Sequence, residues 1–254
     1  MNKQQKDFCF CTLALGKKYC LLAKQLAEDL AIYFPGACLI IYTDYPQYFT
    51  ENPNTLIFKH QQQGILNCYH DKRFVIAEAL SRFKTAICID ADTRILNGIQ
   101  DNIEWIPGIT VGHHENLIAH VSKYNPERLE PIKIVASKLN LNLDEVEYVG
   151  ESLCILTRDE GKELEFIKLW GNIGRYLELK GIHSGEGNTM GLAAAKLGWK
   201  INSYGWEEMK QLTQHLDISH TNIKENFWHQ LRLKFGYHYR LNRARLMDLN
   251  DFKF

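Results

Sequence analysis

The chain has 254 residues, of which 45% are hydrophobic and 24% are charged, as is ordinary for a soluble globular protein. This composition excludes a chain that is disordered throughout. Thirty basic and thirty acidic residues cancel, so no overall charge points to a nucleic-acid partner, and we expect none.

The amino-terminal residues 1–7 lead into a strand-like segment without a long apolar stretch. We therefore expect neither a signal peptide nor a membrane span, and a cytoplasmic location. The cysteines number seven, have no CxxC spacing and lie mostly in apolar runs. They are predicted to be reduced and buried, not to form disulfides or a zinc site.

The first hundred residues alternate between apolar strands and helices. Helix periodicity appears at Leu22, Leu26 and Leu30, and Phe34-Pro35-Gly36 is expected to end that helix. A second helix is predicted over 72–83. The predicted strands, each apolar throughout, cover 8–13, 38–43, 55–58 and 85–89. This pattern predicts a mostly parallel α/β sheet, Rossmann-like and sandwiched by helices.

The remainder of the chain is predicted to be less regular. Further strands are expected at 109–113, 146–149, 153–156 and 199–204. Helices are expected at 159–179 and 188–197, with another between 113 and 146 that Asn125 caps and Pro126 opens. No repeat or linker interrupts the sequence. We predict a single domain over 1–254, with a nucleotide-binding half at 1–100 and an acceptor-binding half at 101–254.

Two carboxylates, Asp90 and Asp92, follow the apolar strand 85–89 directly. Residues i and i+2 of an extended segment point to the same side, so both can contact one hard cation such as Mn²⁺ or Mg²⁺. The carboxyl ends of strands are where open α/β sheets bind ligands. The sequence therefore predicts a solvent-facing metal site; the alternative is an Asp-rich turn.

The order of these motifs resembles that of the GT-A glycosyltransferases, which use a metal held by a DxD motif to transfer a sugar from a nucleotide diphosphate. The segments 14–19 and 42–44 look like the opening of the blood-group-type family six, and 88–93 looks like the metal motif of family eight. Arg73, seventeen residues before Asp90, sits where family eight commonly places a donor-binding arginine. The alternative for Arg73 is a solvated helix residue paired with Asp71 or Glu78.

The resemblance also implies roles for other residues. A late histidine, His220, would be a third metal ligand and Lys224 would contact the diphosphate, although the spacing of this lysine departs from the family pattern. The alternative for His220 is a structural role that involves no metal. The residues expected to bind the donor are Thr12, Leu13, Ala14, Tyr19, Arg73, Asp90, Ala91, Asn188 and Lys224.

Glu186 lies between Gly185 and Gly187 at a predicted helix start, so we expect it to be exposed. By resemblance it would act at the reacting centre, with Asn188 positioning a donor hydroxyl. The alternative is an acid that favours the helix dipole. The segment 148–152 resembles the floor of the acceptor site.

The carboxyl-terminal residues 227–245 are rich in aromatic and basic side chains. They indicate either peripheral contact with an anionic membrane surface or a helix that packs its aromatic residues on the core.

The sequence thus predicts a metal-dependent glycosyltransferase with a UDP-sugar donor and, by resemblance, retention of configuration. The acceptor, whether glycan, lipid-linked molecule or protein, is left open. A nucleotidyltransferase and a non-catalytic sugar-nucleotide or glycan-binding module are the alternatives. The first would need a Gly-rich, basic phosphate loop after the first strand, which the sequence lacks.

Overall fold

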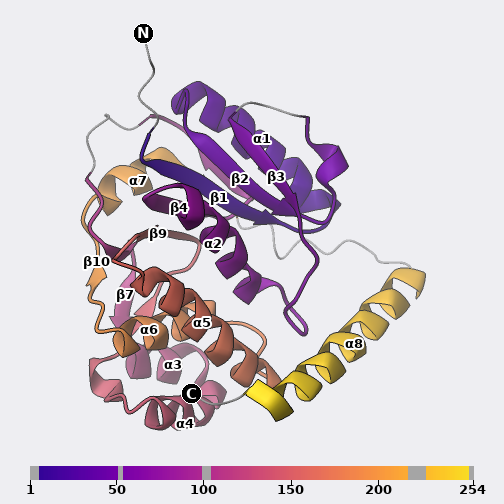
Figure 1. Cartoon of the computed structure of the whole chain (residues 1–254), viewed down its shortest axis with the longest axis vertical. Helices are drawn as coiled ribbons and strands as arrows, with labels where there is room; N and C mark the ends of the chain where they lie inside the picture. Colours follow the sequence, from indigo (N-terminus) through magenta and orange to yellow (C-terminus); the bar gives the residue numbers. More distant parts are fainter. Residues whose placement is uncertain (1–5, 51–53, 99–103, 217–226, 252–254) are drawn as a thin grey trace.

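The computed structural model describes residues 6–50, 54–98, 104–216 and 227–251, which form a seven-stranded sheet with helices on both faces (Figure 1). Its strands are β1 (Phe8–Ala14), β2 (Cys38–Thr43), β3 (Thr55–Lys59), β4 (Thr85–Ile89), β6 (Gly108–Val111), β9 (Leu153–Thr157) and β10 (Ile201–Asn202). The spatial order is β10-β6-β9-β4-β1-β2-β3, and only β9 runs antiparallel to its neighbours among these described strands. The predicted mostly parallel α/β sheet is confirmed.

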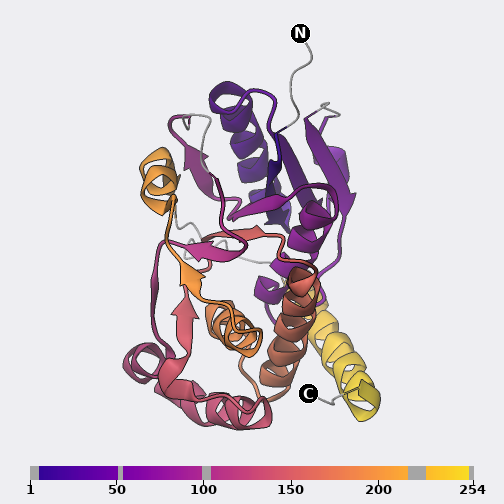
Figure 2. The same ribbon diagram turned by 60° about the vertical axis from the view of Figure 1, so that its left-hand side comes forward.

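Alternating side chains of the strands pack against different helices. Phe10 lies in one hydrophobic cluster with Leu26 of α1 (Lys17–Tyr33) and Met209 of α7 (Trp206–Leu212). Its neighbour Cys9 lies in the other cluster with Val75 of α2 (Lys72–Arg82). That second face also carries α5 (Lys162–Leu179) and α6 (Glu186–Lys196), which lie side by side (Figure 2).

The predicted stop of the first helix is confirmed. Phe34 donates its backbone N–H to Leu30 O at 2.8 Å, and Gly36 follows with φ 84°. The positive φ favours glycine because it has no Cβ.

The region between 113 and 146 differs from the single helix that was predicted. It contains α3 (Leu117–Tyr124), a 3₁₀ turn opened by Pro126, and then α4 (Leu129–Lys138). Pro131 lies in the first turn of α4, where helix N–H groups have no intrahelical partner, so the helix tolerates it. The late strand is also shorter than predicted, since β10 spans only Ile201–Asn202.

Two small antiparallel sheets and one long helix complete the described structure. β5 (Thr93–Ile95) pairs with β11 (Thr213–His215), and β7 (His114–Asn116) pairs with β8 (Glu147–Val149). The helix α8 (Phe227–Asp251) lies beside α5 (Figure 1).

The seven cysteines are all free thiols, as predicted, and five of them are buried. Burial raises the pKa of Cys20 and of Cys38, which keeps these thiols protonated. Among the described helices, none combines the length and the apolar character needed to cross a membrane.

Candidate active site

A cavity of about 820 Å³ opens at the carboxyl ends of β1 and β4. It extends from the β1–α1 connection to the start of α6 and the β8–β9 connection. The residues that line it are Leu13, Leu15, Tyr19, Gln62, Leu66, Asn67, Cys68, Tyr69, Lys72, Asp90, Ala91, Asp92, His113, His120, Asn125, Arg128, Tyr148, Gly150, Glu151, Ser152, Ser184, Gly185, Glu186, Asn188 and His215.

Asp90, Asp92 and His215 converge in this cavity. The carboxylates follow β4 directly, and pairing of β11 with β5 places His215 opposite Thr93. One potential ligand atom from each of the three residues lies within 4.8 Å of the others, and His215 Nδ1 is 3.6 Å from Asp92 Oδ1. Carboxylate oxygens with one imidazole nitrogen suit Mn²⁺, and carboxylates suit Mg²⁺, so the donor set fits the predicted metal.

The prediction that both carboxylates face solvent is wrong for Asp92. Its side chain is 7% exposed, whereas that of Asp90 is 24% exposed. His215 of β11 lies beside this carboxylate, with Nδ1 3.6 Å from Asp92 Oδ1, and the next residue, Leu216, donates its backbone N–H to Asp92 O at 2.9 Å.

The predicted third ligand, His220, and the predicted diphosphate contact, Lys224, lie outside the described residues. The histidine that the structure places beside Asp92 is His215, which the sequence analysis missed. His215 ends a three-residue strand, and nothing in such a short segment distinguishes a ligand from a surface histidine.

Lys72 links the Asp90 carboxylate to two further residues of the cavity, Glu186 and Glu151. Its Nζ lies 2.7 Å from Asp90 Oδ1 and 3.2 Å from Glu186 Oε1, and it donates to the backbone oxygen of Glu151 at 3.3 Å. Burial acts to lower the pKa of Lys72, but Asp90 and Glu186 raise it well above its usual value. The ammonium group is therefore charged, and it holds two carboxylates of the site together.

Asp90 titrates above its ordinary range despite this partner. Burial raises the pKa of Asp90 to about 6, and the neighbouring Lys72 offsets only part of the effect. A metal that requires the carboxylate form would bind more tightly as the pH rises through this value.

Arg73 is not one of the described residues that line the cavity. Its guanidinium lies 3.8 Å from the centroid of the Phe74 ring, and its Nε would be 2.7 Å from a Cβ at Gly171 of α5. Burial lowers the pKa of Arg73 to about 10. Consecutive helix residues point about 100° apart, so Lys72 faces the cavity while Arg73 packs against α5.

The predicted nucleotide-binding segment only partly reaches the cavity. Leu13, Tyr19 and Ala91 line it, whereas Thr12 and Ala14 are buried and do not occur among its described lining residues. The alternation of side chains along β1 separates Leu13 from its two neighbours. The loop after β1 is held in place by Asp44, which accepts a hydrogen bond from Gly16 N at 2.8 Å.

Glu186 is buried, so the prediction that it is exposed is wrong. It is the first residue of α6, it is 3% exposed, and it follows Gly185 with φ 86°. The ion pair with Lys72 compensates its burial.

Asn188 lies one residue beyond Gly187 and also lines the cavity. Its side chain is 2% exposed, and Oδ1 has no hydrogen-bond partner among the described atoms. A buried amide oxygen is rarely left without a donor, so a ligand hydroxyl or a water molecule is expected to supply one.

The predicted acceptor floor contributes Tyr148, Gly150, Glu151 and Ser152 to the cavity wall. Tyr148 donates its hydroxyl to Glu151 Oε2 at 2.6 Å. Burial, followed by the nearby charge of Glu186, raises the pKa of Glu151 to about 7. A carboxyl group that titrates near neutrality can take up or release a proton, a property that the sequence analysis did not foresee.

Neither a scan of the chain against protein-family models nor a search of curated proteins gave a match.

Proposed function

We propose that this protein is a metal-dependent glycosyltransferase of the GT-A type, which transfers a sugar from a nucleotide diphosphate donor, with UDP-sugars as the expected class. The observation that carries this proposal is the convergence of Asp90, Asp92 and His215 at the end of a central strand, in a cavity large enough for a nucleotide-sugar. The metal, Mn²⁺ or Mg²⁺, would neutralise charge on the leaving diphosphate.

The residues of the chain would orient the donor. Asp90 and Asp92 hold the cation, while Tyr19 offers an aromatic ring near the end of β1 for the nucleobase. Lys72 supplies a fixed positive charge beside Asp90, where it can contact diphosphate or sugar oxygens.

The opposite wall would act on the sugar. The unsatisfied oxygen of Asn188 can accept a hydrogen bond from a donor hydroxyl. Glu186 presents a carboxylate close to Lys72, where it would stabilise developing positive charge at the anomeric carbon or accept a proton from the acceptor. Retention of configuration at the anomeric carbon is proposed from the family resemblance alone.

Calorimetric titration with UDP, with and without Mn²⁺, tests this proposal. We expect affinity to depend on Mn²⁺ in the wild-type protein and to fall by more than about tenfold in Asp92→Asn, because a metal ligand is lost. Asp144→Asn, which makes the same change at an exposed position that does not line the cavity, is the matched control and should retain the dependence.

Donor hydrolysis then separates the alternatives. Release of sugar from a UDP-sugar supports a transferase. Binding of UDP without turnover of any common UDP-sugar supports a binding module, and formation of a nucleotide-sugar from a nucleoside triphosphate and a sugar phosphate supports a nucleotidyltransferase. Wild-type protein that binds UDP equally well without metal would contradict the proposed site.

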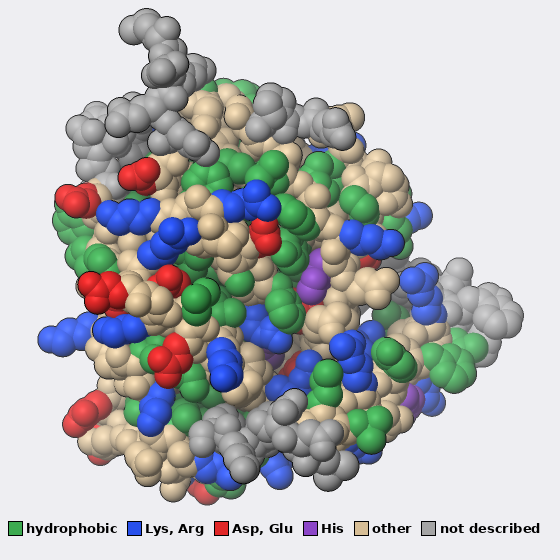
Figure 3. Space-filling model, in the orientation of Figure 1, with side chains coloured by type: hydrophobic (Ala, Val, Ile, Leu, Met, Phe, Trp, Pro, Cys, Tyr) green, Lys and Arg blue, Asp and Glu red, His purple; other side chains and the backbone are tan. Residues whose placement is uncertain are grey.

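We also propose that α8 contacts an anionic lipid surface, which would suit an acceptor carried in a membrane. Exposed apolar residues, Leu233, Phe235 and Tyr239, lie on this helix together with exposed arginine and lysine side chains. Figure 3 shows basic and hydrophobic side chains next to one another over this part of the surface. Such a mixture favours the interface of an anionic membrane.

A further inference from the structure

A second group of potential metal ligands, separate from Asp90, Asp92 and His215, includes two histidines that line the cavity. It consists of His113, Glu115 and His120, whose nearest ligand atoms lie within 4.8 Å of one another. His113 follows β6, Glu115 is the central residue of β7, and His120 lies on α3. Three successive elements therefore bring two imidazoles and one carboxylate to one place.

The ligand atoms already face each other. Glu115 Oε1 is 2.6 Å from His120 Nδ1 and 3.4 Å from His113 Nε2. Tetrahedral zinc with bonds of about 2.1 Å separates its ligand atoms by about 3.4 Å. The Glu115–His113 pair already has this separation, and the Glu115–His120 pair would reach it by opening about 0.8 Å, from 2.6 Å to about 3.4 Å.

The surrounding structure restricts the His120 side chain and the backbone that carries His113. The His120 ring stacks on Tyr148 with a centroid distance of 3.5 Å and an interplanar angle of 7°. The backbone at His113 is fixed by Gly150, whose N–H donates to His113 O at 2.8 Å. Ligands that are held in place before the metal arrives lose less conformational freedom on binding.

We propose that His113, Glu115 and His120 form a second divalent-metal site, with a preference for Zn²⁺. Two imidazoles and one carboxylate are a ligand set that zinc adopts when it keeps its fourth position open. Imidazole nitrogen also favours zinc over magnesium, whereas the carboxylates Asp90 and Asp92 favour the harder ions.

The open position of this site is reachable from the cavity, because His113 and His120 both line it. Their side chains are 63% and 15% exposed, so a bound ion would remain accessible. If the proposed transferase function holds, the ion lies at the acceptor end and selects an acceptor with an anionic oxygen, such as a phosphate or carboxylate. The binding of the metal itself does not depend on that function.

The experiment uses calorimetric titration with Zn²⁺ on the full chain carrying Asp90→Asn and Asp92→Asn, which removes two ligands of the first site. We expect one equivalent of Zn²⁺ to bind. Adding His113→Ala, Glu115→Gln or His120→Phe should each weaken that binding by about tenfold or more. Phenylalanine preserves an aromatic ring against Tyr148, so the last variant keeps the stack.

His114→Ala provides the matched control, because His114 is on the same strand and pairs instead with Glu147 at 2.7 Å. Its Zn²⁺ affinity should stay within about twofold of the parent. Circular dichroism of each variant checks the fold, and titration of Co²⁺ should give a visible absorption band that Glu115→Gln removes. Unchanged Zn²⁺ affinity in the folded ligand variants, or an equal loss in His114→Ala, would overturn the second site while leaving the UDP and Mn²⁺ results unaffected.

Discussion

Lys72 places one positive charge between two carboxylates that would otherwise repel each other. Its distances of 2.7 Å to Asp90 and 3.2 Å to Glu186 are those of direct ion pairs. The proposed donor diphosphate would compete for the same ammonium group, so the ion pairs would exchange if donor and metal bound as proposed. Carboxyl groups still outnumber basic side chains in the cavity, which is lined by Asp90, Asp92, Glu151 and Glu186 but only by Lys72 and Arg128.

Glu186→Gln should separate binding from turnover. A carboxylate at the reacting centre stabilises the transition state more than the bound donor, so we expect UDP-sugar affinity to change little and turnover to fall by about a hundredfold or more. Glutamine keeps an oxygen that can accept from Lys72. The rate of donor hydrolysis or transfer at saturating UDP-sugar and Mn²⁺ gives the measurement.

Glu165→Gln, at an exposed position of α5, controls for the removal of one negative charge. Its turnover should match that of the wild type. Full activity of Glu186→Gln would contradict the proposed role of Glu186 and would leave the proposed metal site untested by this variant.

His70 makes stability depend on pH. Burial lowers the pKa of His70 to about 4, and Trp170 Nε1 donates a hydrogen bond to its Nδ1 at 3.1 Å. An unfolded histidine has a pKa of about 6.5. Between these values the unfolded chain binds a proton and the folded chain does not, so this group lowers stability as the pH falls, by up to about 1.4 kcal/mol per pH unit.

Urea unfolding of the wild type and of His70→Gln, measured from about pH 7 to about pH 4, isolates this contribution. The difference in free energy of unfolding between the two proteins should move in favour of the variant as the pH falls through the window. Parallel pH dependences would show that His70 titrates normally in the folded protein.

The adjacent residues Lys72 and Arg73 have different environments, and the sequence alone could not show which of the two lines the cavity. Its spacing from Asp90 suggested that Arg73 binds the donor. In the structure the rotation of α2 directs Lys72 into the cavity instead. Asp90, Asp92 and the 148–152 segment were found because they directly follow or precede apolar strands. His215 was missed because its position depends on a pairing with β5, which no local pattern encodes.

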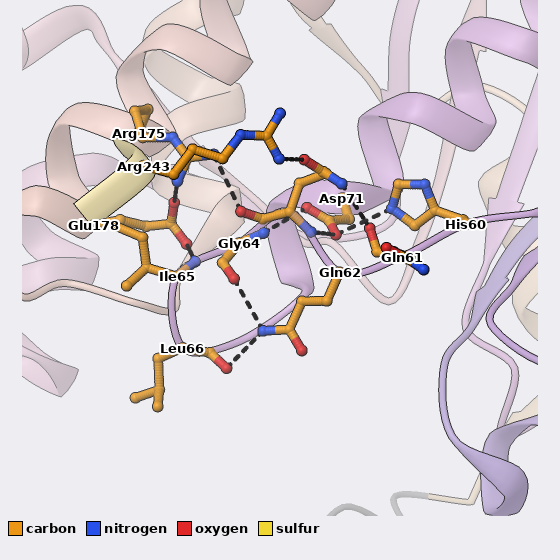
Figure 4. A network of polar contacts seen from close by, with 11 residues as sticks. His60, Gln61, Gln62, Gly64, Ile65, Leu66, Asp71, Arg175, Glu178 and Arg243 are labelled. Atoms are coloured by element: carbon orange, nitrogen blue, oxygen red, sulfur yellow. Dashed lines mark hydrogen bonds and ion pairs between the residues drawn. The ribbon is translucent and has the colours of Figure 1, made fainter. Parts of the chain in front are cut away.

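At the scale of elements, the loop 60–68 is held by contacts from three helices and also lines the cavity. Figure 4 shows Asp71 and Glu178 on opposite sides of this loop. Asp71 accepts hydrogen bonds from Gln63 N at 2.7 Å and Gly64 N at 3.0 Å, while Glu178 accepts from Ile65 N at 2.7 Å. Burial raises the pKa of Glu178 to about 7.

Arg240 extends this network to α8, since its Nε donates to Ile65 O at 3.1 Å. We expect Arg240→Ala to increase amide hydrogen exchange in the loop by about tenfold, because a hydrogen bond to a charged group contributes about 1.5–3 kcal/mol. Global stability should change less. Mass-spectrometric exchange of peptides covering 60–68 gives the readout.

Arg245→Ala is the control on the same helix, because Arg245 is exposed. It should leave exchange in the loop unchanged. Equal protection of the loop in Arg240→Ala and the wild type would mean that α8 does not support this wall of the cavity.

Elements with a strong local pattern were the ones that could be predicted. β2 and β4 have the predicted bounds because each is an uninterrupted apolar run, and α2 ends within one residue of the expected position. β8 falls within the strand predicted at 146–149, but β5, β7 and β11 were not predicted, because three residues are too few for alternation to be recognised. They nevertheless carry His215 and Glu115, so the least predictable elements supply ligands to both candidate metal sites.

At the scale of the whole molecule, thirty basic and thirty acidic residues leave no net attraction to an anionic membrane. Binding to lipid must then come from a local surface, and α8 offers exposed apolar and basic side chains together. Each basic residue near an anionic surface contributes about 1 kcal/mol, an effect that added salt screens. The interaction should therefore depend on lipid charge, on salt and on α8.

Sedimentation with phospholipid vesicles tests this expectation. The wild type should bind vesicles that contain anionic lipid, bind neutral vesicles more weakly, and dissociate as salt rises from about 0.05 M to about 0.5 M. Arg232→Glu combined with Lys234→Glu, at exposed positions of α8, should weaken binding to anionic vesicles by tenfold or more, since two favourable charges become unfavourable. Lys17→Glu combined with Lys84→Glu changes the net charge equally at exposed positions outside α8 and should reduce binding much less.

Equal losses in the two double variants would mean that total charge governs the interaction, and α8 would then be a helix that only packs against α5 and the loop 60–68.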